Sequence, residues 1–146
     1  MLVRTAVCAA LAVALSASAV IAQSKAIAER KDIMKGVGAA AKTGAAMARG
    51  SAPYDNAKAV EVFTIYANAA EKMPGLFPDD SKTGGETTAS PKIWEDMAGF
   101  KAAFAKFAES SKAAQSSVKD LDSFKVAFGE AGKQCGSCHE VYRIKK

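Results

Sequence analysis

The feature that most constrains this chain is a run of five residues near the C-terminus, Cys135-Gly136-Ser137-Cys138-His139. Two thiols three residues apart, followed directly by an imidazole, form the attachment pattern of a c-type haem. In a helix, Cys135, Cys138 and His139 stand at positions i, i+3 and i+4 and share one face. The motif therefore predicts a helix that holds one haem c covalently through two thioethers, with His139 as an axial ligand of the iron.

Three other uses of this motif are weaker. A dithiol redox site normally opens a helix that follows a strand, and no strand pattern precedes Cys135. A structural zinc ion needs four ligands, whereas the motif offers three and the chain has no second histidine. A disulfide between Cys135 and Cys138 would close a very short loop inside a helix and would contribute little stability.

The first 22 residues have the organisation of a secretory signal peptide. Arg4 supplies a positive start, residues 7–15 form an apolar run, and small residues at 20–22 offer a cleavage site before Gln23. The alternative is a retained anchor helix, but the apolar run is short for a membrane span. We therefore predict a cleaved signal at 1–22, one mature domain at 23–146, and no stable membrane insertion. The periplasm is the expected location, because thioether-forming cysteines suit an oxidising compartment.

The net charge limits the class of partner. Without the signal, the chain holds 19 basic residues against 15 acidic ones, a net charge of +4. The lysines are scattered, and neither an arginine cluster nor an interleaved aromatic pattern indicates nucleic-acid binding. The charge is typical of a solvated surface that favours acidic protein partners.

The composition of the mature chain, rich in Ala and Lys and poor in β-branched runs, predicts an all-α domain. Turn signals at 50–53 and 73–75, and cap residues at 55, 90 and 120, divide it into four helices. The expected helices run over about 25–49, 55–72, 91–116, and from 120 almost to the C-terminus. The connection at 74–89 is long, and we expect a surface loop without assigned chemistry there.

The last two expected helices each carry an apolar stripe at helical spacing. The stripe of the third helix contains Ile93, Met97, Phe100, Phe104 and Phe107. The stripe of the fourth contains Leu121, Phe124, Phe128, Ala131, Cys135, Cys138 and Tyr142. Because the two cysteines continue the core face, we expect an antiparallel up-down four-helix bundle that encloses the haem. We expect Gly129 and Gly132 to lie where a neighbouring helix or the porphyrin comes close to the fourth helix.

The second axial ligand decides the function. His139 is the only histidine, so methionine sulfur is the natural partner, and such a pair makes an electron-transfer haem. The candidates in the mature chain are Met34, Met47, Met73 and Met97. Met34 has the best surroundings, because Arg30 lies one turn before it and Gly38 one turn after it. The small residue permits close approach, and Arg30 can meet a propionate carboxylate. Met97 fits the core stripe, and Met34 too can be read as a core methionine.

Three stretches together resemble the class II cytochromes c, four-helix cytochromes with a haem site near the C-terminus. They are CGSCHEVYR in the last helix, ERKDIMK in the first and SPKIWED at the start of the third. The resemblance covers essentially the whole mature chain. It implies that Arg30 lies near a haem propionate, that Met34 occupies the distal position over the iron, and that Arg143 follows the haem histidine in its usual place.

The family that the chain resembles has two branches. In the low-spin c-556 branch the first-helix methionine binds the iron and the protein carries electrons. In the high-spin cytochromes c′ the iron is five-coordinate, binds NO or CO, and the protein often dimerises. The pattern R-x-x-x-M-K-x-x-G from Arg30 to Gly38 looks more like the low-spin branch, although some high-spin members also carry a methionine there.

We therefore expect a low-spin Met34/His139 electron carrier that serves redox partner proteins, as a monomer or a homodimer. The alternative is a high-spin cytochrome c′ that binds NO or CO. An enzyme is not expected, because a methionine ligand closes the iron and no second histidine is present as an acid or base.

Overall fold

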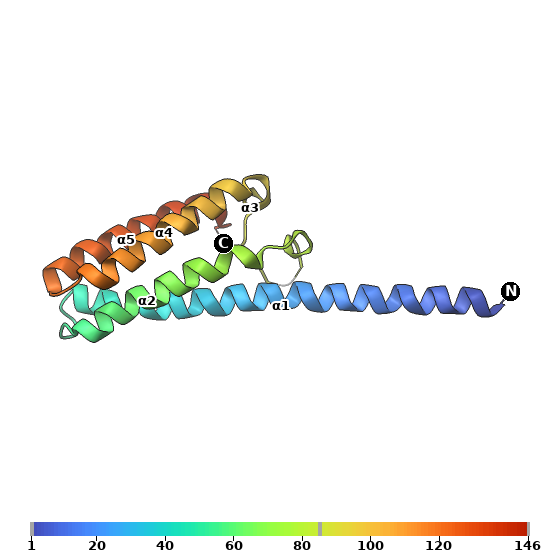
Figure 1. The fold of residues 1–146 in the computed structure, drawn as a ribbon, viewed down its shortest axis with the longest axis horizontal. Helices are drawn as coiled ribbons and strands as arrows, with labels where there is room; N and C mark the ends of the chain where they lie inside the picture. Colours follow the sequence, from blue (N-terminus) through green and yellow to red (C-terminus); the bar gives the residue numbers. More distant parts are fainter. Residues whose placement is uncertain (1, 85, 146) are drawn as a thin grey trace.

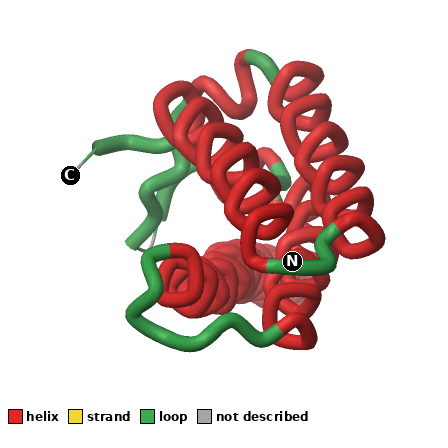
Figure 2. Tube along the Cα trace, turned by 90° about the vertical axis from the view of Figure 1, so that its left-hand side faces the viewer, coloured by secondary structure: helices red, strands yellow, loops and turns green. Residues whose placement is uncertain are grey.

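The computed structural model describes residues 2–84 and 86–145, with side chains described from Lys25 onward. The helices are α1 (Leu2–Ala48), α2 (Asn56–Lys72), α3 (Lys92–Glu95), α4 (Met97–Ser117) and α5 (Leu121–Tyr142). Two 3-10 turns, η1 (Met73–Leu76) and η2 (Asp79–Ser81), lie between α2 and α3. Helices α1, α2, α4 and α5 run alternately up and down and form one bundle, seen lengthwise in Figure 1 and end-on in Figure 2. The predicted all-α four-helix bundle is confirmed.

Helix α1 is longer than the sequence predicted. The expected first helix covered about 25–49, whereas α1 begins at Leu2, and its N-terminal part projects beyond the bundle (Figure 1). No glycine or proline interrupts the alanine-rich chain between 2 and 35, so nothing local ends the helix. Cleavage of a signal at 1–22 stays a prediction, and the side chains there lie outside the described residues. Of the helices that the structure describes, none combines the length and the apolar content that crossing a membrane requires.

The predicted helix ends around the connection between α1 and α2 are confirmed by their caps. Helix α1 ends at Ala48, and Gly50 just after it has φ +74°. The N–H groups of Gly50 and Ser51 donate to the carbonyls of Met47 and Ala46, as in a Schellman ending. Asp55 caps α2 by accepting a hydrogen bond from the Lys58 N–H at 3.1 Å. The caps fix where the chain reverses.

Helix α5 begins with a capping box. The Asp120 carboxylate accepts a hydrogen bond from the Ser123 N–H at 2.8 Å. In return, the Ser123 hydroxyl accepts a hydrogen bond from the Asp120 N–H at 3.1 Å. Two donors of the first turn are thereby satisfied, so the predicted start near Asp120 is confirmed. The haem motif lies in the last two turns of this helix.

The third predicted helix is broken in two, which corrects the single helix expected over 91–116. Asp96 adopts an extended φ of −134° between α3 and α4, and its carboxylate accepts from the Gly99 N–H at 3.1 Å. A Cβ built at Gly99 would overlap this carboxylate, so a larger residue there would displace the capping side chain. Asp96 therefore ends one short helix and begins the next.

The buried core consists of two clusters, one at each end of the bundle. The closed-end cluster contains Ala40, Met47, Ala59, Val62, Phe63, Tyr66, Ala114, Val118, Phe124 and Ala131. The site-end cluster contains Ala70, Met73, Phe77, Ile93, Phe100 and Phe104. Helix α5 gives Phe124 and Ala131 to the first cluster, and its Tyr142 packs against the second. The haem motif lies between these two contributions of α5.

The connection between α2 and α3 is more than the surface loop that the sequence predicted for 74–89. Its turns η1 and η2 pack against α1, and both Phe77 and Ser81 are buried. The expectation was wrong because a single buried aromatic in a polar stretch has no periodicity that marks it as core. The connection is therefore part of the core at the site end of the bundle.

Candidate haem-binding site

The two cysteines of the motif are half-buried. They continue the face of α5 on which Phe124 and Ala131 are buried. Burial raises the pKa of both thiols, and the neighbouring Cys135 adds to the rise at Cys138. The thiols are therefore protonated near neutral pH, and they are not joined to each other. Among the described side chains, no group of three or more His, Cys, Asp or Glu is placed to hold a metal ion, so the zinc alternative gains no support.

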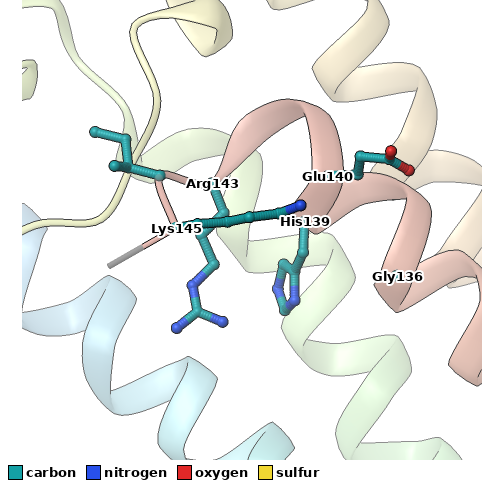
Figure 3. Close-up of a pocket in the computed structure, with 6 residues that line it drawn as sticks. Gly136, His139, Glu140, Arg143 and Lys145 are labelled. Carbon is teal, nitrogen blue, oxygen red and sulfur yellow. The ribbon is translucent and has the colours of Figure 1, made fainter.

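His139 lies at the mouth of a cavity of about 630 Å³. The lining residues are Gly136, His139, Glu140, Arg143, Ile144 and Lys145. In Figure 3 the ring of His139 and the guanidinium of Arg143 extend to the same side of α5, whereas Glu140 points away from them. Burial, and then the charge of Arg143, lower the pKa of His139. The neutral imidazole that results is the form that binds iron.

The side of α5 that carries His139 is exposed, and so are the three glycines on it. A Cβ built at Gly132 or Gly136 meets no atom within 4 Å, and the same holds at Gly129. No neighbouring helix therefore approaches Gly129 or Gly132, and the alternative that the porphyrin comes close to them stays a prediction. Nearer the start of α5, a Cβ built at Gly44 of α1 would overlap the ring of Phe128. Helices α1 and α5 therefore come close where Gly44 faces Phe128.

Two of the four candidate methionines are buried in the core. Met47 is 2% exposed in the closed-end cluster, and Met73 is 5% exposed in the site-end cluster. Met34 on α1 and Met97 on α4 are only partly buried, and both pack against the site-end cluster. Tyr142, one turn after His139, packs against the same cluster. Met34 therefore lies at the bundle end that holds the haem motif, with a sulfur that the core does not enclose.

Arg30 lies one turn before Met34 and is only 5% exposed. Its Nη1 donates to the Ser81 hydroxyl at 3.3 Å, and its Nη2 donates to the Ser81 carbonyl at 3.2 Å. The guanidinium carbon stands 4.4 Å from the centre of the Phe77 ring. Burial lowers the pKa of Arg30, and no ion pair with a described carboxylate compensates its charge. A carboxylate brought by a cofactor would supply that compensation, as the resemblance implies.

Arg143 is exposed and lines the cavity just after the last turn of α5. It forms an antiparallel bridge with Ala89 of the connection. The Ser90 N–H donates to the Tyr142 carbonyl at 3.1 Å, and the Ile144 N–H donates to the Thr88 carbonyl at 2.9 Å. The chain that follows the haem motif is thereby fastened to the connection.

Sequence reasoning missed several neighbours of the motif. Tyr66 of α2 is buried, and burial together with the thiol of Cys135 raises its pKa far above the usual range. The Tyr142 hydroxyl donates to the Asp96 carboxylate at 2.9 Å. The spacing of Asp96 and Gly99 could have revealed the cap, whereas no local pattern marks Ser81 as a partner of Arg30.

The described residues fit a haem c. Two thiols share one helix face, a neutral imidazole faces the cavity, and a methionine sulfur lies at the same end of the bundle. The cavity volume of about 630 Å³ is within the roughly 300–1,000 Å³ typical of small-molecule sites. A buried arginine without a carboxylate partner suits a cofactor that carries two propionates.

Comparisons with known proteins agree with this chemistry. Residues 25–143 match the profile of a protein family described as Cytochrome C′. A cytochrome c′ of Rhodopseudomonas palustris is 46% identical over 113 residues, which are 77% of each chain. A cytochrome c-556 of the same organism is 36% identical over 149 residues, 99% of each chain. The solved structure of cytochrome c′ from R. palustris superposes with a TM-score of 0.80 at 47% identity, covering 83% of this chain and 97% of that one.

Proposed function

The chain belongs to the cytochrome c′ family of haem c proteins, and from that premise we propose that it is a periplasmic, low-spin electron carrier. In this proposal Cys135 and Cys138 hold the single haem through thioethers, and His139 and Met34 are its two axial ligands. Haem iron supplies a one-electron couple, and methionine–histidine ligation raises its reduction potential.

Each residue of the site has a distinct task in this proposal. The neutral ring of His139 offers its free nitrogen to the cavity, and the Met34 thioether approaches from α1. The buried Arg30 balances the charge of a propionate, and the exposed Arg143 lies at the cavity mouth. Redox partner proteins would meet the cavity side of α5.

The observation that carries the proposal is the position of Met34. It lies one turn after the buried Arg30 and packs at the bundle end that holds the haem motif. Met47 and Met73 are enclosed by apolar side chains, so they contribute to packing instead. Met34 is only partly buried at the bundle end that holds His139, which suits a ligand better than a core residue.

The second candidate function is that of a high-spin cytochrome c′ that binds NO or CO. It is favoured by the relative named cytochrome c′, which shares a higher identity with this chain than the c-556 of the same organism does. In that case Met34 would pack beside the iron without binding it, and the distal side would remain open to a small gas.

An absorption spectrum of the purified holoprotein separates the two functions. Sulfur ligation predicts a low-spin ferric spectrum with a sulfur-to-iron charge-transfer band. Met34→Leu keeps an apolar side chain of similar size but removes the sulfur, so we expect the band to vanish and the spectrum to become high-spin. The matched control is Met97→Leu, a partly buried methionine against the same cluster, which should leave the band intact.

Two results would contradict the proposal at different levels. A wild-type spectrum that is high-spin and responds readily to CO would replace the electron carrier by the gas-binding protein. A colourless protein with only the mass of its polypeptide, made in a host able to attach haem, would remove the haem site altogether.

A further inference from the structure

The connection between α2 and α3 contacts both helices that carry the proposed axial ligands. It begins with η1 at Met73 and ends at Pro91, just before α3. Its first half binds Arg30 of α1, one turn before Met34. Its second half forms a backbone bridge with Arg143, the residue that follows α5. The connection, which holds no proposed ligand, thus contacts both segments that carry the proposed axial ligands.

The attachment to α1 runs through Arg30. Ser81 accepts two hydrogen bonds from the guanidinium, at 3.3 and 3.2 Å, and Phe77 covers its face. Ser81 is itself fully buried, and its hydroxyl donates to the Pro78 carbonyl at 2.8 Å, which fixes the turn η2. Bonds to a charged donor in a buried place are among the stronger ones in proteins. The exposed ion pair of Lys31 with Glu86 adds little.

The attachment to α5 is made by the backbone. Two hydrogen bonds join residues 88 and 90 to residues 144 and 142, at 2.9 and 3.1 Å. The Tyr142 side chain adds a hydrogen bond to Asp96 and an edge-to-face contact with Phe100 at 5.2 Å. The last turn of α5, which holds His139, therefore cannot fray without breaking these contacts.

Helices α1 and α5 come close at the opposite end of the bundle, where Gly44 lies against Phe128. At the site end, the described hydrogen bonds of Arg30 on α1 and of residues 142 and 144 at the end of α5 run to the connection and not from one helix to the other. We propose that the connection 73–91 is the positioning element of the site, which sets the distance between the Met34 and His139 segments. The proposal rests on the proposed axial roles of these two residues.

Two variants of the holoprotein loosen one attachment each. Ser81→Ala removes a hydroxyl that Arg30 binds, and its control is Ser111→Ala, a buried serine whose hydroxyl has no hydrogen-bond partner. Ile144→Pro removes the N–H that binds the Thr88 carbonyl. Its control is Ile144→Ala, which trims the same exposed side chain but keeps the N–H. Proline is compatible here because Arg143, the preceding residue, is already extended.

The readouts are amide hydrogen exchange and the hyperfine-shifted haem methyl resonances of the ferric protein. Ser81→Ala should speed exchange at 30–34 by roughly fivefold, and Ile144→Pro should do the same at 139–142, as expected for the loss of one hydrogen bond. Both variants should also shift the haem methyl resonances, which report ligand orientation, whereas both controls should leave the resonances in place.

Equal exchange rates and equal haem resonances in each variant and its control would overturn the proposal. The outcome is distinguishable from failure of the proposed function. If the wild type proves high-spin, Met34 is not a ligand, but exchange at 30–34 and 139–142 still shows whether the connection holds the two helices. If the exchange rates change and the haem resonances do not, the connection stabilises the helices without positioning the site, and the proposal fails.

Discussion

The two ends of the bundle are stabilised in different ways. At the closed end, helices meet directly through aromatic rings. The ring of Phe124 on α5 meets the ring of Phe63 on α2 edge to face, with 5.9 Å between the ring centroids. At the site end, α1 and α5 are instead joined through a connection, by hydrogen bonds of Arg30 and of the backbone at 142–144. Both ends hold a buried cluster, but α1 and α5 contact each other directly at the closed end and are joined through the connection at the site end.

This difference explains how one helix serves two purposes. The apolar stripe of α5 is continuous in sequence, but Phe124 and Ala131 are buried in the core whereas Cys135 and Cys138 are half-buried free thiols, which we propose to hold the haem. A bundle that packed tightly along its whole length would leave no room for a porphyrin. The closed end therefore supplies the stability that permits the other end to stay open.

The largest expected effect comes from removing one buried ring at each end. Phe124→Ala and Phe100→Ala each delete a ring that is at most 2% exposed, and each should lower the free energy of unfolding by about 3–5 kcal/mol. Denaturant unfolding measures the loss. Phe100 also contacts Phe77 and Tyr142, whereas Phe124 lies among closed-end residues. Only Phe100→Ala should therefore change the haem absorption spectrum under native conditions.

An equal change of the haem absorption spectrum in both variants would contradict separate roles for the two ends. Such a result would mean that the closed end also fixes the geometry of the site. The protein would then behave as one undivided core, and the two clusters would have no separate roles.

A smaller effect is expected from adding one methyl group to α1. Gly44→Ala forces a Cβ into the ring of Phe128, and overpacking of this kind costs about 1–3 kcal/mol. Gly36→Ala is the matched control, because Gly36 is exposed and its Cβ would meet nothing within 4 Å. There alanine should stabilise the helix by up to about 1 kcal/mol. Thermal unfolding should therefore shift in opposite directions, and a shift in the same direction would contradict the close contact at the closed end.

The sequence was sufficient to predict the bundle and the attachment motif. Local signals did this: Asp55 and Asp120 mark helix starts, and Gly50 marks a helix end. The break at Asp96 was missed because the apolar stripe continues across it from Ile93 to Phe100, and a stripe does not reveal a cap within it.

The site was predictable only where its chemistry is local. Cys135, Cys138 and His139 follow from one motif, and the choice of Met34 needs its neighbours on the helix. The partners of Arg30 are about fifty residues away in the sequence, and no periodicity connects Ser81 to α1. The spin state depends on how closely a sulfur approaches the iron, and one sequence does not encode that distance in a readable pattern. For the same reason it stays a prediction.

The smallest expected effect is a pH dependence that both ends share. Hydrogen bonds from Tyr142 and from the Gly99 N–H hold the pKa of Asp96 below its ordinary value of 3.8, and Ser123 does the same for Asp120. A carboxyl with a lowered pKa stabilises the folded protein above its unfolded pKa, and this contribution is lost as the pH falls through the lower folded value. The free energy of unfolding should therefore decline below about pH 4.

Asparagine at either position keeps a capping side chain but removes the titrating charge. Asp96→Asn and Asp120→Asn should each flatten part of that decline, measured by denaturant unfolding at a series of pH values. The two ends should differ in one respect, because only Asp96 also holds Tyr142 of α5. The haem spectrum of Asp96→Asn should accordingly change at neutral pH while that of Asp120→Asn does not. If instead neither variant altered the acid dependence, the two carboxylates would not be the groups that make the fold sensitive to acid.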